Sequence, residues 1–135
     1  MLNIIIHLST LFVFSLMPVW AEQNSSSQEA LRKTQDVIRN PQKRNAVIQD
    51  DQKAMKAEEI VRQVMGENTD EIHHLSAEIL EVIYKQADGD ELKMQEIVNQ
   101  ASRNPAAFLQ SLPEDYKNKV HSLADKSPLQ KNQRP

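Results

Sequence analysis

The residues best suited to chemistry lie in one stretch, "DEIHHLSAEILE", at residues 70–81. It holds two adjacent histidines among carboxylates, and its apolar residues recur at helical spacing. Side chains three or four residues apart share one face of a helix, whereas adjacent side chains diverge by about 100°. His73 and His74 therefore cannot bind one metal ion together from a regular helix.

His74 is the better ligand candidate because Glu71 and Glu78 lie on its face of the predicted helix. Glu71 and His74 form a Glu-x-x-His pair, a spacing that helical bundles use to bind paired metal ions. Such a site needs a second pair of this kind from another helix, and the sequence contains no other Glu-x-x-His. Glu71, His74 and Glu78 are therefore weak metal candidates. We expect a solvated polar face here, with no cofactor.

The other candidate residues also suit structural roles. His73 lies near the edge of the apolar arc, where we expect a boundary residue, and His121 with Asp125 one turn later suits the end of a helix. Nucleophilic catalysis needs a base that is held by a third group. The chain has no cysteine, and its serines approach histidines only in sequence. We therefore predict a protein that is not an enzyme, with the acidic pairs at 50–51 and 114–115 serving as helix caps or solubilising charge.

The first 21 residues contain no Asp, Glu, Lys or Arg. An apolar run over 4–17 is followed by Pro18, and Val19 and Ala21 occupy the small-residue positions of a cleavage site. This layout predicts a signal peptide over 1–21 that is cut after Ala21. Because a bilayer span needs roughly 20 apolar residues, a retained anchor is the less favoured alternative. Export without cysteine, and so without disulfides, fits a bacterial envelope better than a eukaryotic extracellular space and predicts a periplasmic or secreted protein.

Beyond a polar leader at 22–26, helical periodicity accounts for nearly every apolar residue, and the alternation typical of strands is absent. We therefore expect an all-α domain over 27–124, a small irregular helical bundle of four to six short helices. A polar tail over 125–135 is expected to be disordered. The expected helices cover 27–39, 41–65, 69–87, 91–102, 105–112 and 113–124.

Helix boundaries follow from a few residue types. Asn-Pro pairs at 40–41 and 104–105 separate helices, because proline suits the first turn of a helix but not its interior. Gly66 suits a left-handed helix end. Asp50 and Lys53 fall within the apolar arc of 41–65, so a break near 50–52 is the alternative to one continuous helix.

Charge is distributed unevenly along the chain. Residues 27–65 hold eight basic and six acidic side chains, residues 66–96 two basic and nine acidic, and residues 97–135 six basic and three acidic. The acidic middle could attract basic partners or let copies associate head to tail, or it could simply solvate an exported protein. Nucleic-acid binding is disfavoured, because the net charge is −3 and no basic cluster stands beside stacking aromatics.

These patterns together predict an exported non-catalytic helical protein, a small interaction or assembly module in the bacterial envelope. We expect a protein partner or self-association, and no stable membrane span after cleavage. The alternative is a periplasmic holdase-like or cation-buffering stress protein that uses methionine-containing apolar faces.

Overall fold

Seven α-helices and one short 3-10 turn form residues 27–128, which are the part of the chain that the computed structural model describes. No strand occurs within this range, so the predicted all-α class and helical bundle are confirmed. The predicted signal peptide with its cleavage at Ala21, the leader at 22–26 and residues 129–135 lie outside the described part. The elements are α2 (Ser27–Arg39), α3 (Pro41–Ile48), α4 (Gln52–Met65), η2 (Gly66–Asn68), α5 (Thr69–Gln86), α6 (Glu91–Arg103), α7 (Pro105–Ser111) and α8 (Glu114–Lys126).

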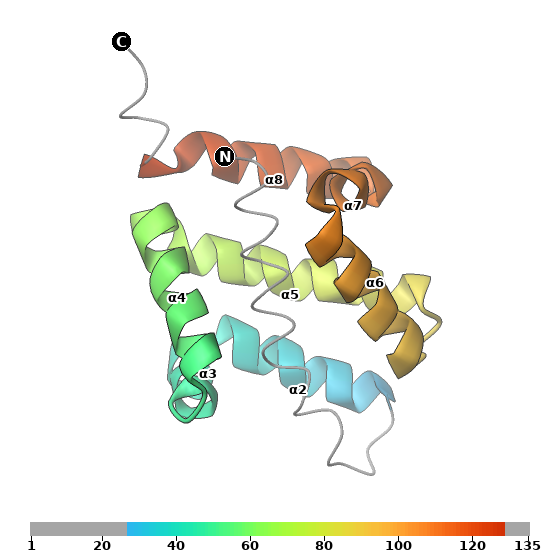
Figure 1. The fold of residues 1–135 in the computed structure, drawn as a ribbon, viewed down its shortest axis with the longest axis horizontal. Coiled ribbons are helices and arrows are strands. Elements are labelled where there is room, and N and C mark those ends of the chain that lie inside the picture. Colours follow the sequence, from blue (N-terminus) through green and yellow to red (C-terminus); the bar gives the residue numbers. More distant parts are fainter. Residues whose placement is uncertain (1–26, 129–135) are drawn as a thin grey trace.

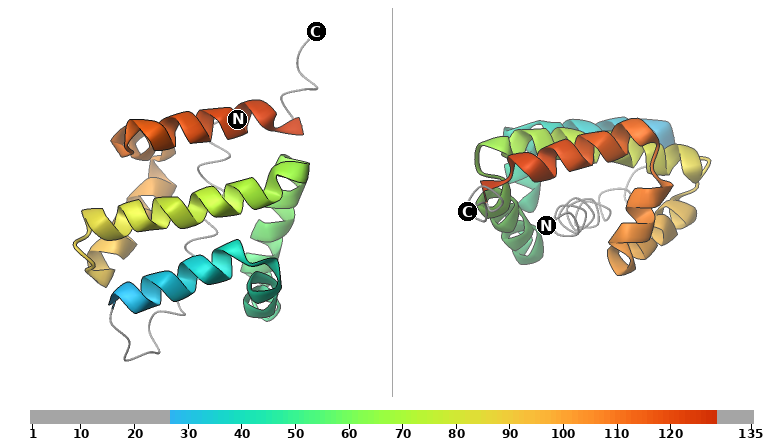
Figure 2. Two further views of the ribbon diagram at one scale, coloured as in Figure 1. Left: turned by 180° about the vertical axis from the view of Figure 1, so that it is seen from behind. Right: turned by 90° about the horizontal axis from the view of Figure 1, so that it is seen from above.

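Helix α5 is the centre of the bundle. Helices α2 and α8 lie on either side of it and form one layer with it (Figure 1). Viewed from above, α3 and α4 project from one end of this layer, and α6 and α7 project from the other end toward the same side (Figure 2). Helix α5 is therefore buried on several sides. Its buried residues are Ile72, His73, Leu75, Ser76, Ala77, Ile79, Leu80 and Ile83.

Side-chain caps begin four helices where the sequence provides Asn or Asp. The Asn40 side chain accepts hydrogen bonds from the backbone N–H groups of Gln42 and Lys43, and Asn104 accepts one from Ala107. Asp90 accepts one from Lys93 at the start of α6. Each cap satisfies a donor that a helix start leaves unpaired. The predicted boundaries at both Asn-Pro pairs and at 88–90 are confirmed.

The region 41–65 contains two helices, so the alternative with a break near 50–52 is correct. The Asp51 side chain accepts hydrogen bonds from the N–H groups of Lys53 (2.8 Å) and Ala54 (3.1 Å) and thereby caps α4. Helix α4 ends at Gly66, as predicted, with a positive φ of +56° that glycine adopts readily. Its ψ of −123° lies outside the left-handed helical region, so this helix end is not the left-handed one expected.

No side chain caps the start of α5. Asn68 caps nothing with its side chain, and its amide Nδ2 donates instead to the carbonyls of Met65 and Lys126. Thr69 donates its hydroxyl to the Gly66 carbonyl at 2.6 Å. The continuous path from α4 through η2 into α5 leaves no extended residue at this point, and a side-chain cap needs one.

The apolar face predicted for 41–65 is only partly buried. Five residues of α4 lie inside the protein as expected: Ala54, Ala57, Val61, Val64 and Met65. Val47 of α3 and Ile60 of α4, which share the predicted arc, are exposed. Glu58 is buried in place of an apolar residue.

Order extends past residue 124, where the polar tail was expected to begin. Helix α8 continues to Lys126, and Ser127 is buried with its hydroxyl donating to the Val64 carbonyl at 2.8 Å. This bond joins the end of α8 to the end of α4. Among residues 27–128, no helix combines the length and the apolar character that crossing a bilayer requires.

Candidate functional site

The predicted polar face of α5 lies beside α8. Glu71 and His74 are exposed and Glu78 is partly buried, as part of a shallow surface depression between the two helices. Two lysines of α8 bind these carboxylates. Lys126 Nζ lies 2.8 Å from Glu71 Oε2, and Lys119 pairs with Glu78.

Both carboxylates of the proposed ligand set are thus engaged by ammonium groups. Within residues 27–128, no group of three or more His, Asp or Glu side chains is placed to hold a metal ion. Further along α5 lies an ion pair within the helix, with Lys85 Nζ 2.9 Å from Glu81 Oε1. The Lys85 hydrogen bond and charge lower the pKa of Glu81 below its usual value, and the same pair raises the pKa of Lys85.

The other residues considered as candidates lie at the surface, in a helix end or in a hydrogen bond within a helix. His121 and Asp125 are both exposed on α8. Ser76, which stands close to both histidines in sequence, donates its buried hydroxyl to the Ile72 carbonyl at 2.8 Å. Glu114 lies in the first turn of α8, where the helix dipole favours a negative charge.

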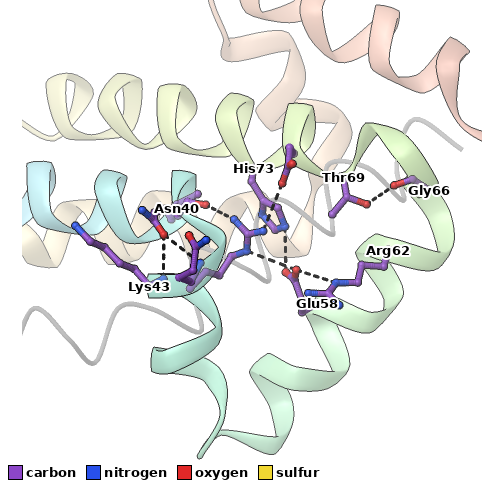
Figure 3. A network of polar contacts seen from close by, with 11 residues as sticks. Asn40, Lys43, Glu58, Arg62, Gly66, Thr69 and His73 are labelled. Atoms are coloured by element: carbon purple, nitrogen blue, oxygen red, sulfur yellow. Dashed lines mark hydrogen bonds and ion pairs between the residues drawn. The ribbon is translucent and has the colours of Figure 1, made fainter.

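His73 is not a boundary residue, as the sequence suggested, but is almost completely buried, with a side-chain exposure of 2%. Helix α4 packs against that side of α5 and brings a carboxylate to it. His73 Nε2 lies 3.0 Å from Glu58 Oε2 (Figure 3). The sequence patterns above predict no role for Glu58.

A third helix completes this arrangement. Arg44 of α3 is 2% exposed, its Nε lies 3.5 Å from Glu58 Oε1, and its Nη1 donates to the Ile38 carbonyl of α2 at 2.6 Å. We call Arg44, Glu58 and His73 the buried charged cluster. It joins α3, α4 and α5 directly and reaches the end of α2 through Arg44.

Two exposed residues border the buried charged cluster. Arg62 Nε, one turn along α4, lies 3.3 Å from Glu58 Oε1, and Asp70 Oδ1 of α5 lies 3.6 Å from Arg44 Nη2. Glu58 therefore faces cationic or hydrogen-bonding partners from all three helices. Asp70, at 71% side-chain exposure, balances the outer side of Arg44.

The electrostatic outcome at Glu58 is a balance of opposing effects. Burial raises the pKa of a carboxyl group, whereas the hydrogen bond to His73 and the charges of His73 and Arg44 lower it. The lowering effects prevail, so the pKa of Glu58 lies below its ordinary value of 4.5. Glu58 is therefore a carboxylate at neutral pH, although its surroundings are buried.

Sequence could have flagged Glu58, because it follows Ala54 by four residues and precedes Val61 by three, within the apolar arc. Arg44 similarly precedes Ile48 by four residues. A charged residue on an apolar face signals a partner charge on another helix, since buried charges are retained when paired. The signal does not say which helix carries that partner.

An open groove lies between α3 and α4, next to the buried charged cluster. It encloses about 560 Å³, and Ile48 and Met55 supply apolar surface in its lining, with Glu58 and Arg62 along one side. Lys56 and Glu59 also line it and add charges of both signs. We call this feature the α3–α4 groove.

The α3–α4 groove can accept an apolar side chain and hydrogen-bond polar groups around it. Comparison of the chain with protein-family models, with curated proteins and with solved structures finds no match in any of the three.

Proposed function

We propose that the chain is an exported, non-catalytic helical protein that acts as a small interaction or assembly module in the bacterial envelope. The observation that supports this proposal is the α3–α4 groove, an open depression with apolar surface. Contiguous exposed apolar surface on a small soluble protein commonly marks an interaction site.

The occupant that fits the α3–α4 groove best is an amphipathic helix of a partner protein. Such helices bind by laying their apolar face into a groove between two others. Met55, half exposed in the groove, has a flexible side chain that adapts to an incoming surface. Lys56 and Glu59 would pair with the polar flanks of that helix.

Exposed apolar residues on the same two helices support a broader contact. Val47 of α3 is 38% exposed and Ile60 of α4 is 44% exposed. A bound helix of three to four turns, about 20 Å long, could reach beyond the groove to such residues.

A photo-reactive residue placed at Gln52, in the groove lining, tests this function in cells. We expect one discrete crosslinked product, and we expect its yield to fall about tenfold when Met55→Glu is added, because burying an unpaired carboxylate opposes docking. The matched control places the same photo-reactive residue at Gln95, which is exposed on α6. The same product from Gln95, or a product insensitive to Met55→Glu, would argue against the groove as the binding site.

Export is the second half of the proposal, and the apolar run with its small-residue cleavage site at Ala21 supports it. The mass of the chain recovered from the periplasmic or culture fraction should correspond to a protein that begins at Glu22. Recovery of the chain only from the cytosol with Met1 in place would contradict export.

A holdase-like role is the second candidate, favoured by large apolar side chains exposed on separate helices. Besides Val47, Met55 and Ile60, Leu92 at the start of α6 is 79% exposed. A holdase should suppress aggregation of an unfolded client at a near-equimolar ratio. An interaction module that recognises one helix should not.

A further inference from the structure

We propose that the buried charged cluster is an acid-sensitive latch that holds α3 and α4 against α5 and releases them when Glu58 is protonated. The inference is independent of which partner occupies the α3–α4 groove. It rests on the position of one carboxylate at the junction of three helices (Figure 3).

Among residues 27–128, Glu58 is the acidic side chain that is buried. Cationic or hydrogen-bonding groups face it from every neighbouring helix. Arg44 approaches from α3 at 3.5 Å, Arg62 from its own helix at 3.3 Å, and His73 from α5 at 3.0 Å. The other nearby acid, Asp70, contacts Arg44 from the solvent side. Glu58 is thus the inner counter-charge of this junction.

Protonation of Glu58 would remove that counter-charge while the guanidinium of Arg44 keeps its own. A buried charge whose partner is lost is strongly destabilising, because the interior cannot solvate it as water does. Separation of α3 and α4 from α5 admits water to Arg44 and relieves this cost. The same carboxylate that joins the helices therefore controls their release.

The direction of the pH dependence follows from the lowered pKa of Glu58. A carboxyl group whose pKa is lower in the folded state contributes stability that is complete above its unfolded value and is lost as the pH falls through the folded value. The ordinary value is 4.5, so the latch stays closed at neutral pH and opens only in acid below that point.

The connections around α3 and α4 allow them to move together. The pair joins the rest of the described chain at Asn40 and at η2, where Gly66 has a positive φ. The hydrogen bond from Ser127 to the Val64 carbonyl has no ionisable partner, so it retains the end of α4. Opening would therefore turn about η2 and expose the buried face of α4 described above, which makes a new apolar binding surface in acid.

Hydrogen exchange at neutral pH tests the latch with Glu58→Gln, which imitates the protonated side chain. We expect exchange across 41–65 to accelerate at least about tenfold while the core of α5 stays protected. The matched control is Glu59→Gln, which changes an exposed neighbour and should exchange like the unchanged protein. Full protection of 41–65 in Glu58→Gln would overturn the proposal.

If Glu58→Gln unfolds entirely, a second variant tests the proposed latch. Arg44→Met, Glu58→Leu and His73→Leu in combination replace the latch by apolar packing, which often preserves or improves stability. Binding of an apolar dye should rise below pH 4.5 in the unchanged protein and stay low in the triple variant. A triple variant that fails to fold, or that binds the dye at the same acid pH as the unchanged protein, would overturn the proposal.

Discussion

Two regions of the molecule use similar charges to join helices, and they differ in their access to water. Between α5 and α8, Lys126 pairs with Glu71 while both side chains remain about half exposed. Between α3, α4 and α5, Arg44 and Glu58 are 2% and 5% exposed. Water competes for the first pair and has little access to the second.

The comparison distinguishes charges that stay solvated at the surface from charges on which the packing of the helices depends. Exposed ion pairs contribute little to the free energy of unfolding, because water solvates each separated charge almost as well as the two charges stabilise each other. A buried charge has no such alternative, so loss of one partner leaves the other without solvation. We therefore expect substitutions of equal chemistry to have unequal effects in the two regions.

Arg44→Met should have the largest effect, a loss of about 3–5 kcal/mol in the free energy of unfolding. It leaves Glu58 without its α3 partner and also removes the bond to the Ile38 carbonyl. Urea unfolding followed by circular dichroism measures this loss. Arg62→Met is the matched control: Arg62 also contacts Glu58 but is 57% exposed, so its loss should stay below about 1 kcal/mol. Equal losses for the two arginines would remove the distinction between the regions.

Acid should destabilise the protein mainly through the buried region. Because the pKa of Glu58 is lowered, the free energy of unfolding should hold between neutral pH and 4.5 and then fall as the carboxylate takes up a proton. Urea midpoints across this range should show a smaller acid loss in Glu58→Gln than in the unchanged protein. Glu81→Gln is the control, since the pKa of Glu81 is also lowered but its pair with Lys85 is largely exposed to water. If Glu81→Gln, and not Glu58→Gln, reduced the loss of stability in acid, the result would contradict the account.

Asp51→Ala should cost about 1 kcal/mol, the usual effect of removing a helix N-cap. Asp51 accepts two backbone hydrogen bonds at the start of α4, and Asp50 beside it makes no cap. The control Asp50→Ala should stay within about 0.5 kcal/mol. This pair of variants shows how much the stability of α4 depends on its N-terminal cap and how much on the buried charged cluster. A loss for Asp51→Ala as large as that for Arg44→Met would mean that the helix end dominates.

Lys126→Met should have the smallest effect, about 0.2–1 kcal/mol, and it should shrink further at high salt. The exposed partner Glu71 is resolvated when the ammonium group is removed. Thermal unfolding at low and high salt measures the dependence. A loss that persists undiminished at high salt would show that the α5–α8 contact is not a solvated ion pair.

Much of the fold follows from local residue chemistry. Asn40, Asp90 and Asn104 cap helices where the sequence places them, and Gly66 ends α4, because these residues act on backbone groups only a few positions away. The apolar spacing of α5 likewise predicts its buried side. Such features need no knowledge of other helices.

The buried charged cluster could not be predicted in the same way. Arg44, Glu58 and His73 lie on three helices, and each alone is a polar residue near an apolar face. Their roles depend on how α3 and α4 cross α5, which the break at 49–51 determines. Helical periodicity predicts a boundary position for His73, which is buried, because periodicity describes one helix and not the surface that another helix covers.

A double-mutant cycle measures the central claim most directly, namely that Glu58 and Arg44 hold α3 and α4 together through a buried interaction. The variants are Arg44→Met, Glu58→Gln and their combination, compared with Lys126→Met, Glu71→Gln and theirs. We predict a coupling free energy of about 2–3 kcal/mol for the buried pair and below about 1 kcal/mol for the exposed pair. Coupling of equal size in the two cycles would contradict the account.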